Sequence, residues 1–197
     1  MTLAIGAYFF LIAFILAHLE IQIEGPHGWA EKLPTWRWDG PQVRRWFGKP
    51  VTGYHLCLLT CILLFLHVPQ FYGGSWEREA DLLALFFLLT VTWDFLWFAC
   101  NRHFGVGKFR KGHIWWFPTW ALGMPQPYLI TLALSLVAAL APALWTGGWA
   151  DRAQRWGLVV GELLVLTILV TAFTLRPRRR DPAHRRRVRD AVKIKPQ

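Results

Sequence analysis

Acidic and histidine side chains gather at the ends of three apolar segments, where they could bind a metal. Glu20 lies near the end of the first segment and Glu24 just beyond it. His55 lies one turn into the second segment, and Asp94 lies in the last two turns of the third, with His103 just beyond it. If the segments are helices, a rise of 1.5 Å per residue places these groups in one layer, within roughly 10 Å of the same interface. Carboxylates and imidazoles from several helices form metal sites in helical bundles. The sequence therefore predicts a transition-metal site made by these five residues.

An ion-pair network is the alternative to a metal at these positions. Glu20 and Glu24 are four residues apart and share a helix face, but no diagnostic ligand spacing accompanies them. The pair Glu24-x-x-His27 encloses Gly25 and Pro26, which oppose helical geometry. Carboxylates at an interface can instead pair with loop arginines and hold helices together without a substrate. The sequence leaves both interpretations open.

A third interpretation treats His18 and His55 as axial ligands of a haem or chlorin. The two histidines lie at similar depth on neighbouring apolar segments, and such a cofactor needs one or two imidazoles in an aromatic pocket. The chain is 16% aromatic, with 13 Trp, which permits a pocket of this kind. Aromatic belts at both membrane interfaces explain the same composition. The cofactor thus stays open between a transition metal and, as the alternative, a haem or chlorin.

Membrane-spanning helices are the elements that we expect to position these side chains. The chain is 54% hydrophobic and has five apolar runs, each close to the ~20 residues that cross a bilayer. Lipid offers backbone groups no partner, so each run should be helical. The runs cover residues 3–23, 51–68, 82–100, 128–145 and 156–175. We expect an all-α integral membrane protein, with one bundle of five transmembrane helices over residues 1–175 and a basic tail over residues 176–197.

The basic residues predict how the bundle is oriented. The segments after the first and third runs, together with the tail, carry 19 of the 22 Lys and Arg residues. Positively charged segments remain in the cytoplasm. With five spans, this rule places the N-terminus outside and the tail in the cytoplasm, as expected for a protein of the bacterial inner membrane.

The tail is predicted to contact anionic lipid head groups, because clustered basic residues next to a membrane helix attract them. Its role as a topology anchor alone is the alternative. Nucleic-acid binding is not expected, since no folded module or interleaved aromatic residues accompany the charges. The arginines expected to bind head groups are Arg178, Arg179, Arg180, Arg185, Arg186 and Arg187.

Two long connecting segments, over residues 24–50 and 101–127, are rich in Trp, Gly, Pro and His. Each contains a Pro-Thr-Trp triplet, beginning at Pro34 and at Pro118, which is either a trace of internal repetition or a coincidence. Aromatic and arginine residues are enriched in protein interfaces. These segments are therefore candidates for docking other subunits of a membrane complex.

Several short motifs resemble a family of small polytopic bacterial membrane proteins of uncharacterised function. The motifs are Glu24-Gly-x-x-Gly-Trp-Ala, Leu33-Pro-Thr-Trp-Arg37, Gly53-Tyr-His55, and Asp94-Phe-Leu-Trp-Phe98 with Asn101. The resemblance implies the membrane fold and supplies no activity.

Two classes of function fit these observations. The preferred prediction is an accessory, scaffold or assembly subunit that acts through the Trp-rich cytoplasmic segments. The alternative is a membrane-embedded, metal-dependent enzyme that uses the Glu/His/Asp site at the cytoplasmic face on a lipid-like substrate. Loss of bound metal on replacing Glu20 or His55 would favour the enzyme, whereas loss of a complex would favour the scaffold.

Overall fold

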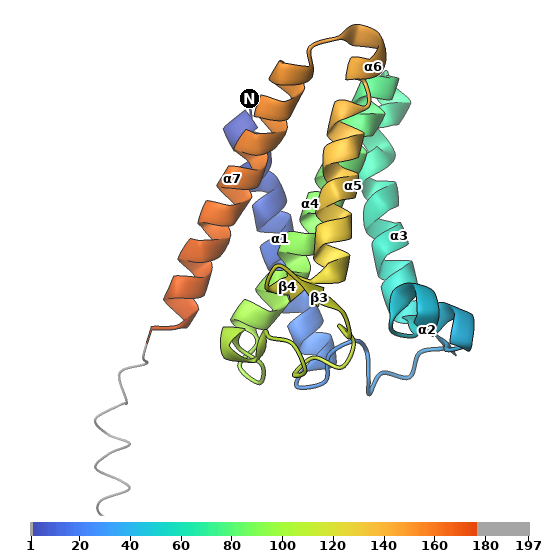
Figure 1. Cartoon of the computed structure of the whole chain (residues 1–197), viewed down its shortest axis with the longest axis vertical. Coiled ribbons are helices and arrows are strands. Elements are labelled where there is room, and N and C mark those ends of the chain that lie inside the picture. Colours follow the sequence, from blue (N-terminus) through green and yellow to red (C-terminus); the bar gives the residue numbers. More distant parts are fainter. Residues whose placement is uncertain (1, 177–197) are drawn as a thin grey trace, which may run out of the picture.

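The computed structural model describes residues 2–176, and most of them are helical (Figure 1). Five helices are long and apolar enough to cross a membrane, as the sequence predicts. They cover Ala4–Glu24, Gly53–Tyr72, Trp76–Cys100, Gln126–Thr146 and Trp149–Thr174. The tail arginines that are expected to bind lipid head groups lie outside the described residues.

Helix α4 (Trp76–Cys100) is the centre of the bundle. Helices α1 (Thr2–Glu24), α5 (Gln126–Leu140) and α7 (Trp149–Thr174) pack around it and against one another. The start of α1 and the short helix α6 (Ala143–Thr146) lie at one end of the bundle, which we call the far end (Figure 1). The two long connecting segments lie at the opposite end, which we call the loop end.

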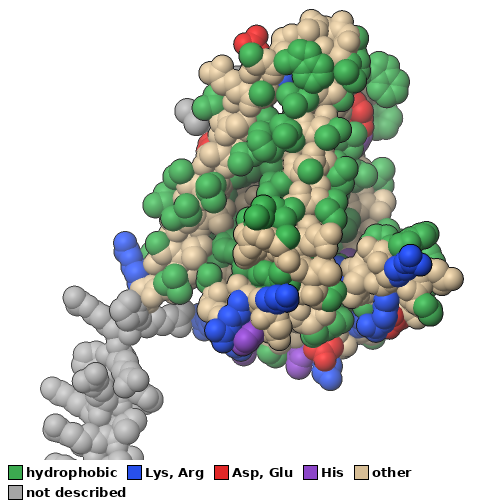
Figure 2. Space-filling view, in the orientation of Figure 1, with side chains coloured by type: hydrophobic (Ala, Val, Ile, Leu, Met, Phe, Trp, Pro, Cys, Tyr) green, Lys and Arg blue, Asp and Glu red, His purple; other side chains and the backbone are tan. Residues whose placement is uncertain are grey.

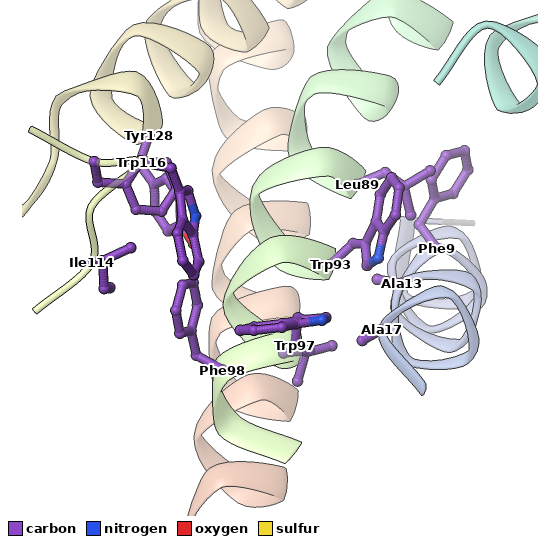
Figure 3. Packing of buried hydrophobic residues seen from close by; sticks show 12 residues of the cluster. Phe9, Ala13, Ala17, Leu89, Trp93, Trp97, Phe98, Ile114, Trp116 and Tyr128 are labelled. Atoms are coloured by element: carbon purple, nitrogen blue, oxygen red, sulfur yellow. The ribbon is translucent and has the colours of Figure 1, made fainter. Parts of the chain in front are cut away.

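Small residues of α1 make room for large aromatic residues of α4. Ala13 and Ala17, four residues apart, are fully buried in the same core as Trp93 and Trp97 (Figure 3). Both indole nitrogens lie on the side of their rings that faces α1. Neither indole N–H has a hydrogen-bond partner within the described part of the chain. Glu20 lies three residues after Ala17, on the same face of α1.

Two helices begin earlier than the apolar runs predict. Helix α4 begins at Trp76 instead of residue 82, and α7 begins at Trp149 instead of residue 156. The side chain of Ser75 caps α4 by accepting a hydrogen bond from the backbone N–H of Arg78 at 3.3 Å. Acidic residues in the first turn suit the positive end of the helix dipole. A polar first turn therefore stays helical although hydropathy alone excludes it.

Helix α3 (Gly53–His67) stands apart from the other membrane helices (Figure 1). Only 6% of its most hydrophobic stretch of 18 residues is buried inside the protein, compared with 50% of the same stretch of α4. A 3₁₀ helix, η1 (Val68–Tyr72), continues α3, because Pro69 cannot donate the next α-helical hydrogen bond. In the same way Pro142 lies between α5 and α6, but Ala141 and Pro142 keep helical φ and ψ, so the expected run over residues 128–145 continues as one span, Gln126–Thr146.

Two small hairpins organise the loop end. Strand β1 (Arg37–Trp38) pairs antiparallel with β2 (Val51–Thr52), and the short helix α2 (Pro41–Phe47) fills the connection. Strand β3 (Trp120–Ala121) pairs with β4 (Met124–Pro125) in the same antiparallel manner. A short 3₁₀ helix, η2 (Val106–Lys108), precedes the second hairpin. Each hairpin returns the chain to the first residue of the next membrane helix, α3 or α5.

Candidate metal centre

Glu20, Glu24 and His55 converge at the loop end, where α1 finishes and α3 begins. One ligand atom from each lies within 4.8 Å of the other two. His55 Nε2 is 3.4 Å from Glu20 Oε1 and 3.7 Å from Glu24 Oε1. All three residues are buried, with 6–8% of their surface exposed. We call these three residues the carboxylate–histidine cluster.

The start of α3 sets the direction of the His55 imidazole. Thr52 is the N-cap of α3, and its Oγ1 accepts a hydrogen bond from the backbone N–H of His55 at 3.3 Å. The same Oγ1 lies 2.6 Å from His55 Nδ1 and forms a second hydrogen bond. When Nδ1–H donates to Thr52, Nε2 carries the lone pair and faces Glu20 and Glu24. Metal-binding histidines are oriented in this way by a partner on the other ring nitrogen.

The chain after α1 folds back to hold Glu24 and to cover His55. The backbone N–H of Ala30 donates to Glu24 Oε1 at 2.5 Å. The indole of Trp29 stacks on the imidazole of His55, with ring centroids 3.9 Å apart, and its Nε1–H donates to Pro50 O at 2.8 Å. Trp29 and Ala30 have φ values of 58° and 52°, which non-glycine residues rarely adopt. The hydrogen bonds to Glu24 and Pro50 offset this strained conformation.

Lys49 brings a positive charge near the cluster. Its Nζ lies 3.2 Å from the centroid of the Trp29 ring and 4.6 Å from that of Phe117, both in cation–π geometry. Burial lowers the pKa of Lys49 to about 8, and the negative charges of Asp94, Glu20 and Glu24 offset part of that lowering. Lys49 is therefore within electrostatic reach of three carboxylates.

Asp94 belongs to the same charged layer but has its own partner. Its carboxylate accepts a hydrogen bond from the hydroxyl of Tyr128, the third residue of α5. When the carboxylates of Glu20, Glu24 and Asp94 are ionised, the ammonium of Lys49 opposes part of their charge. The remaining negative charge has the sign that a bound cation neutralises.

Asn101 ties the second connecting segment to the end of α1. Its Nδ2 donates to the backbone carbonyl of Gly25 at 2.9 Å, and its Oδ1 accepts from the backbone N–H of His103 at 2.9 Å. Asn101 is 1% exposed, so both bonds are shielded from water. The side chain thereby fixes the residue that follows Glu24.

The structure brings together three of the five predicted metal ligands. Asp94 is bonded to Tyr128 as described, and the side chain of His103 is exposed, so neither completes the cluster. The predicted axial pair is not formed either. His18 is exposed, and its Nδ1 lies 3.0 Å from the carbonyl of Phe14 on its own helix. A residue two positions from Glu20 is turned by ~200° around the helix axis and so faces away from His55.

Sequence reasoning missed the residues that support the cluster, namely Thr52, Trp29 and Lys49. A usable signal exists for Thr52, because a threonine three residues before His55 at the start of an apolar run is a typical N-cap. Trp29 and Lys49 carry no such signal. Their positions depend on the backbone reversal at Trp29 and Ala30 and on the first hairpin.

The distances in the cluster match the needs of a metal. Bonds of ~2.1 Å to a tetrahedral ion separate the ligand atoms by about 3.4 Å. The distances of 3.4 Å and 3.7 Å from His55 Nε2 to the two carboxylates lie close to this value. Three acceptor groups that face one another need a cation between them, which is either a proton or a metal ion.

The surface of the loop end differs from the flanks of the bundle. On the face drawn in Figure 2, most Lys, Arg and His side chains gather at the loop end, while the flanks carry apolar side chains. Four aromatic residues of the first connecting segment are more than half exposed. They are Trp36, Trp38, Trp46 and Phe47.

Comparisons with protein-family models, with curated proteins and with solved structures found no match to this chain. The resemblance to small polytopic bacterial membrane proteins therefore stays a prediction, and functional inference depends on the geometry of the site.

Proposed function

We propose that this protein is a membrane-embedded metal-dependent enzyme whose carboxylate–histidine cluster binds one divalent transition-metal ion. The observation that carries the proposal is the convergence of Glu20, Glu24 and His55 within 4.8 Å in a buried site. The oriented imidazole and the two carboxylates that face it support the proposal. These observations favour the metal-dependent enzyme, which the sequence offered as the alternative, over the accessory role.

The ligand set indicates what the metal would do. Three protein ligands leave at least one coordination position for water or substrate, which is typical of catalytic rather than structural sites. One imidazole with two carboxylates suits Zn²⁺, Fe²⁺ or Mn²⁺. The metal would act as a Lewis acid or activate a bound water. The cluster lies at the end of two membrane helices, so the substrate that we propose is lipid-like.

Orientation follows from charge. We propose that the loop end and the tail face the cytoplasm of a bacterial inner membrane, because 19 of the 22 basic residues lie in the two long segments and the tail. In this arrangement the tail arginines contact anionic lipid head groups. The substrate then enters from the cytoplasmic leaflet.

Elemental analysis of detergent-purified protein tests the proposal. Protein from metal-replete cells should contain about one transition-metal ion per chain, and Glu20→Gln and His55→Ala should lose it. His18→Ala is the matched control, because His18 is an exposed histidine of the same helix as Glu20. A folded, monodisperse protein that contains no transition metal contradicts the proposal, as does equal loss of metal in the control.

Docking to another membrane subunit is a second candidate function, supported by the exposed aromatic residues of the loop end. Trp46 is 75% exposed and Trp38 is 62% exposed, so both are available to a partner. The double variant Trp38→Ser/Trp46→Ser should then release a co-purifying subunit and leave metal content unchanged. Cluster variants should have the opposite effect, so the two functions are separable.

A further inference from the structure

A crevice of about 250 Å³ opens at the far end of the bundle, between α1, α4, α5 and α7. It is remote from the carboxylate–histidine cluster, which lies at the loop end. Its deep walls are apolar and include Ile5, Leu88 and Val159. Two arginines of α7, Arg152 and Arg155, line its outer part. The crevice therefore has a charged mouth above an apolar interior.

Helix geometry separates the two levels. Arg152 lies seven residues before Val159 on α7, and Asp81 lies seven residues before Leu88 on α4. A rise of 1.5 Å per residue puts about 10 Å between the polar and apolar levels on both helices. This distance is similar to the distance between the head group of a lipid and the first part of its hydrocarbon chain.

The two arginines differ in how they are compensated. Arg152 is held in place, since its Nη1 donates to Asp81 Oδ1 at 3.1 Å and to the carbonyl of Ala139 at 3.2 Å. Arg155 is exposed, and its Nε donates to the backbone carbonyl of Asp151 at 3.3 Å. Within residues 2–176, no carboxylate lies in ion-pair distance of Arg155. Its guanidinium therefore offers an uncompensated positive charge and free N–H groups at the mouth.

The remaining polar group of the crevice is already satisfied. Trp156 Nε1 donates to Ser135 Oγ at 2.9 Å, and Ser135 Oγ donates to the carbonyl of Ala84 at 2.9 Å. This chain of bonds fixes α7, α5 and α4 relative to one another. The crevice wall is thus rigid, and Arg155 is the group left to recognise a ligand.

We infer that this crevice binds one anionic phospholipid, with the phosphate at Arg155 and the start of an acyl chain between Ile5, Leu88 and Val159. One guanidinium group can donate two parallel hydrogen bonds to two oxygens of the same phosphate. Basic side chains near the membrane surface attract anionic lipid head groups. The inference is independent of the metal site, because no residue is shared.

Native mass spectrometry of the full chain in detergent micelles tests this inference. The probes are dioleoyl phosphatidylglycerol and the zwitterionic dioleoyl phosphatidylcholine. The wild type should retain one phosphatidylglycerol more tightly than phosphatidylcholine. Arg155→Gln should weaken phosphatidylglycerol binding about fivefold, the value expected for one basic residue at the surface. Ile5→Phe should weaken both lipids by filling the apolar part.

Arg78→Gln is the matched control, because Arg78 is an exposed arginine at the same end of the bundle but outside the crevice. It should bind phosphatidylglycerol like the wild type, and the tail is identical in every variant. If Arg78→Gln weakened phosphatidylglycerol binding equally, general surface charge would explain the effect, and the inference would be overturned. Equal affinity for the two lipids in the wild type, or displacement of phosphatidylglycerol by millimolar inorganic phosphate, would overturn it as well.

Discussion

Thr52→Val is the sharpest test of whether the cluster is a metal site. Thr52 is fully buried, and its hydroxyl bonds both the backbone N–H and Nδ1 of His55. Valine keeps the shape of threonine but lacks both bonds, so the imidazole loses the partner that orients it. Loss of a group that orients a metal-binding histidine typically lowers metal affinity by about 10- to 100-fold. That range corresponds to about 1.4–2.8 kcal/mol of binding free energy.

The assay must separate metal binding from folding, because Thr52 also caps α3. Loss of an N-cap lowers the free energy of unfolding by about 1 kcal/mol. Thr35→Val supplies the control, since Thr35 Oγ1 accepts from the backbone N–H of Tyr54 at 2.9 Å and does not bond the imidazole. Affinity is measured by competition with a chelator, and stability by thermal unfolding in the same detergent.

Both variants should lower stability, but only Thr52→Val should lower metal affinity, and Thr52→Ser should restore most of it. Unchanged metal affinity in Thr52→Val would refute the assigned role of the hydroxyl. Equal loss in Thr35→Val would show that affinity simply follows the stability of α3.

Three further predictions concern the surroundings of the cluster. Gly28→Ala should destabilise the protein in thermal unfolding, because a Cβ there would overlap the indole of Trp116, whereas Gly40→Ala, with open space, should not. Asn101→Ala should lower the free energy of unfolding by about 1 kcal/mol, since it removes the hydrogen bond from the buried Asn101 side chain to the carbonyl of Gly25. Burial lowers the pKa of Lys49 from 10.5 to about 8, so between these values the unfolded chain binds a proton that the folded protein lacks. The stability of the metal-free protein should therefore rise from pH 8 to 10.5 in pH-dependent unfolding, and Lys49→Met should remove that rise.

The helices were predictable because lipid leaves the backbone no alternative. The five apolar runs identify the five long helices, and their ends differ most where a polar first turn intervenes. Trp76 and Trp149 begin helices before the apolar runs do, and Pro142 interrupts the helical hydrogen bonds inside its run. Hydropathy measures contact with lipid, whereas capping and proline geometry set where a helix begins and ends.

The sequence predicted how deep each site residue lies along its helix, but it did not predict which face of the helix the residue occupies. Glu20 and Glu24 share a face because they are four residues apart, and this part of the prediction agrees with the structure. His18 has the same depth, yet it lies on the opposite side of α1. His103 fails for another reason, since it lies in a connecting segment whose path no periodicity defines. Depth therefore selects candidates, and only the angle between helix faces decides which of them meet.

The two Pro-Thr-Trp triplets lie at similar places in the fold, although Trp36 precedes strand β1 whereas Trp120 is the first residue of β3. Each leads into a two-residue strand whose partner ends directly before a membrane helix. The backbone N–H of Gly53 donates to the carbonyl of Trp36 at 3.0 Å, and that of Gln126 donates to the carbonyl of Thr119 at 2.9 Å. Both bonds join the first residue of α3 or α5 to its triplet.

The third residues of α3 and α5 also have similar positions, because both lie in the charged layer. His55 is the third residue of α3 and Tyr128 is the third residue of α5. The first faces the carboxylates of α1, and the second bonds the carboxylate of Asp94 on α4. In both cases a hairpin directs a polar side chain of one helix at an acid near the end of the preceding helix. One hairpin thus contributes to the cluster and the other to the Asp94–Tyr128 pair, although the helix α2 fills the connection of the first hairpin and only two residues form the turn of the second.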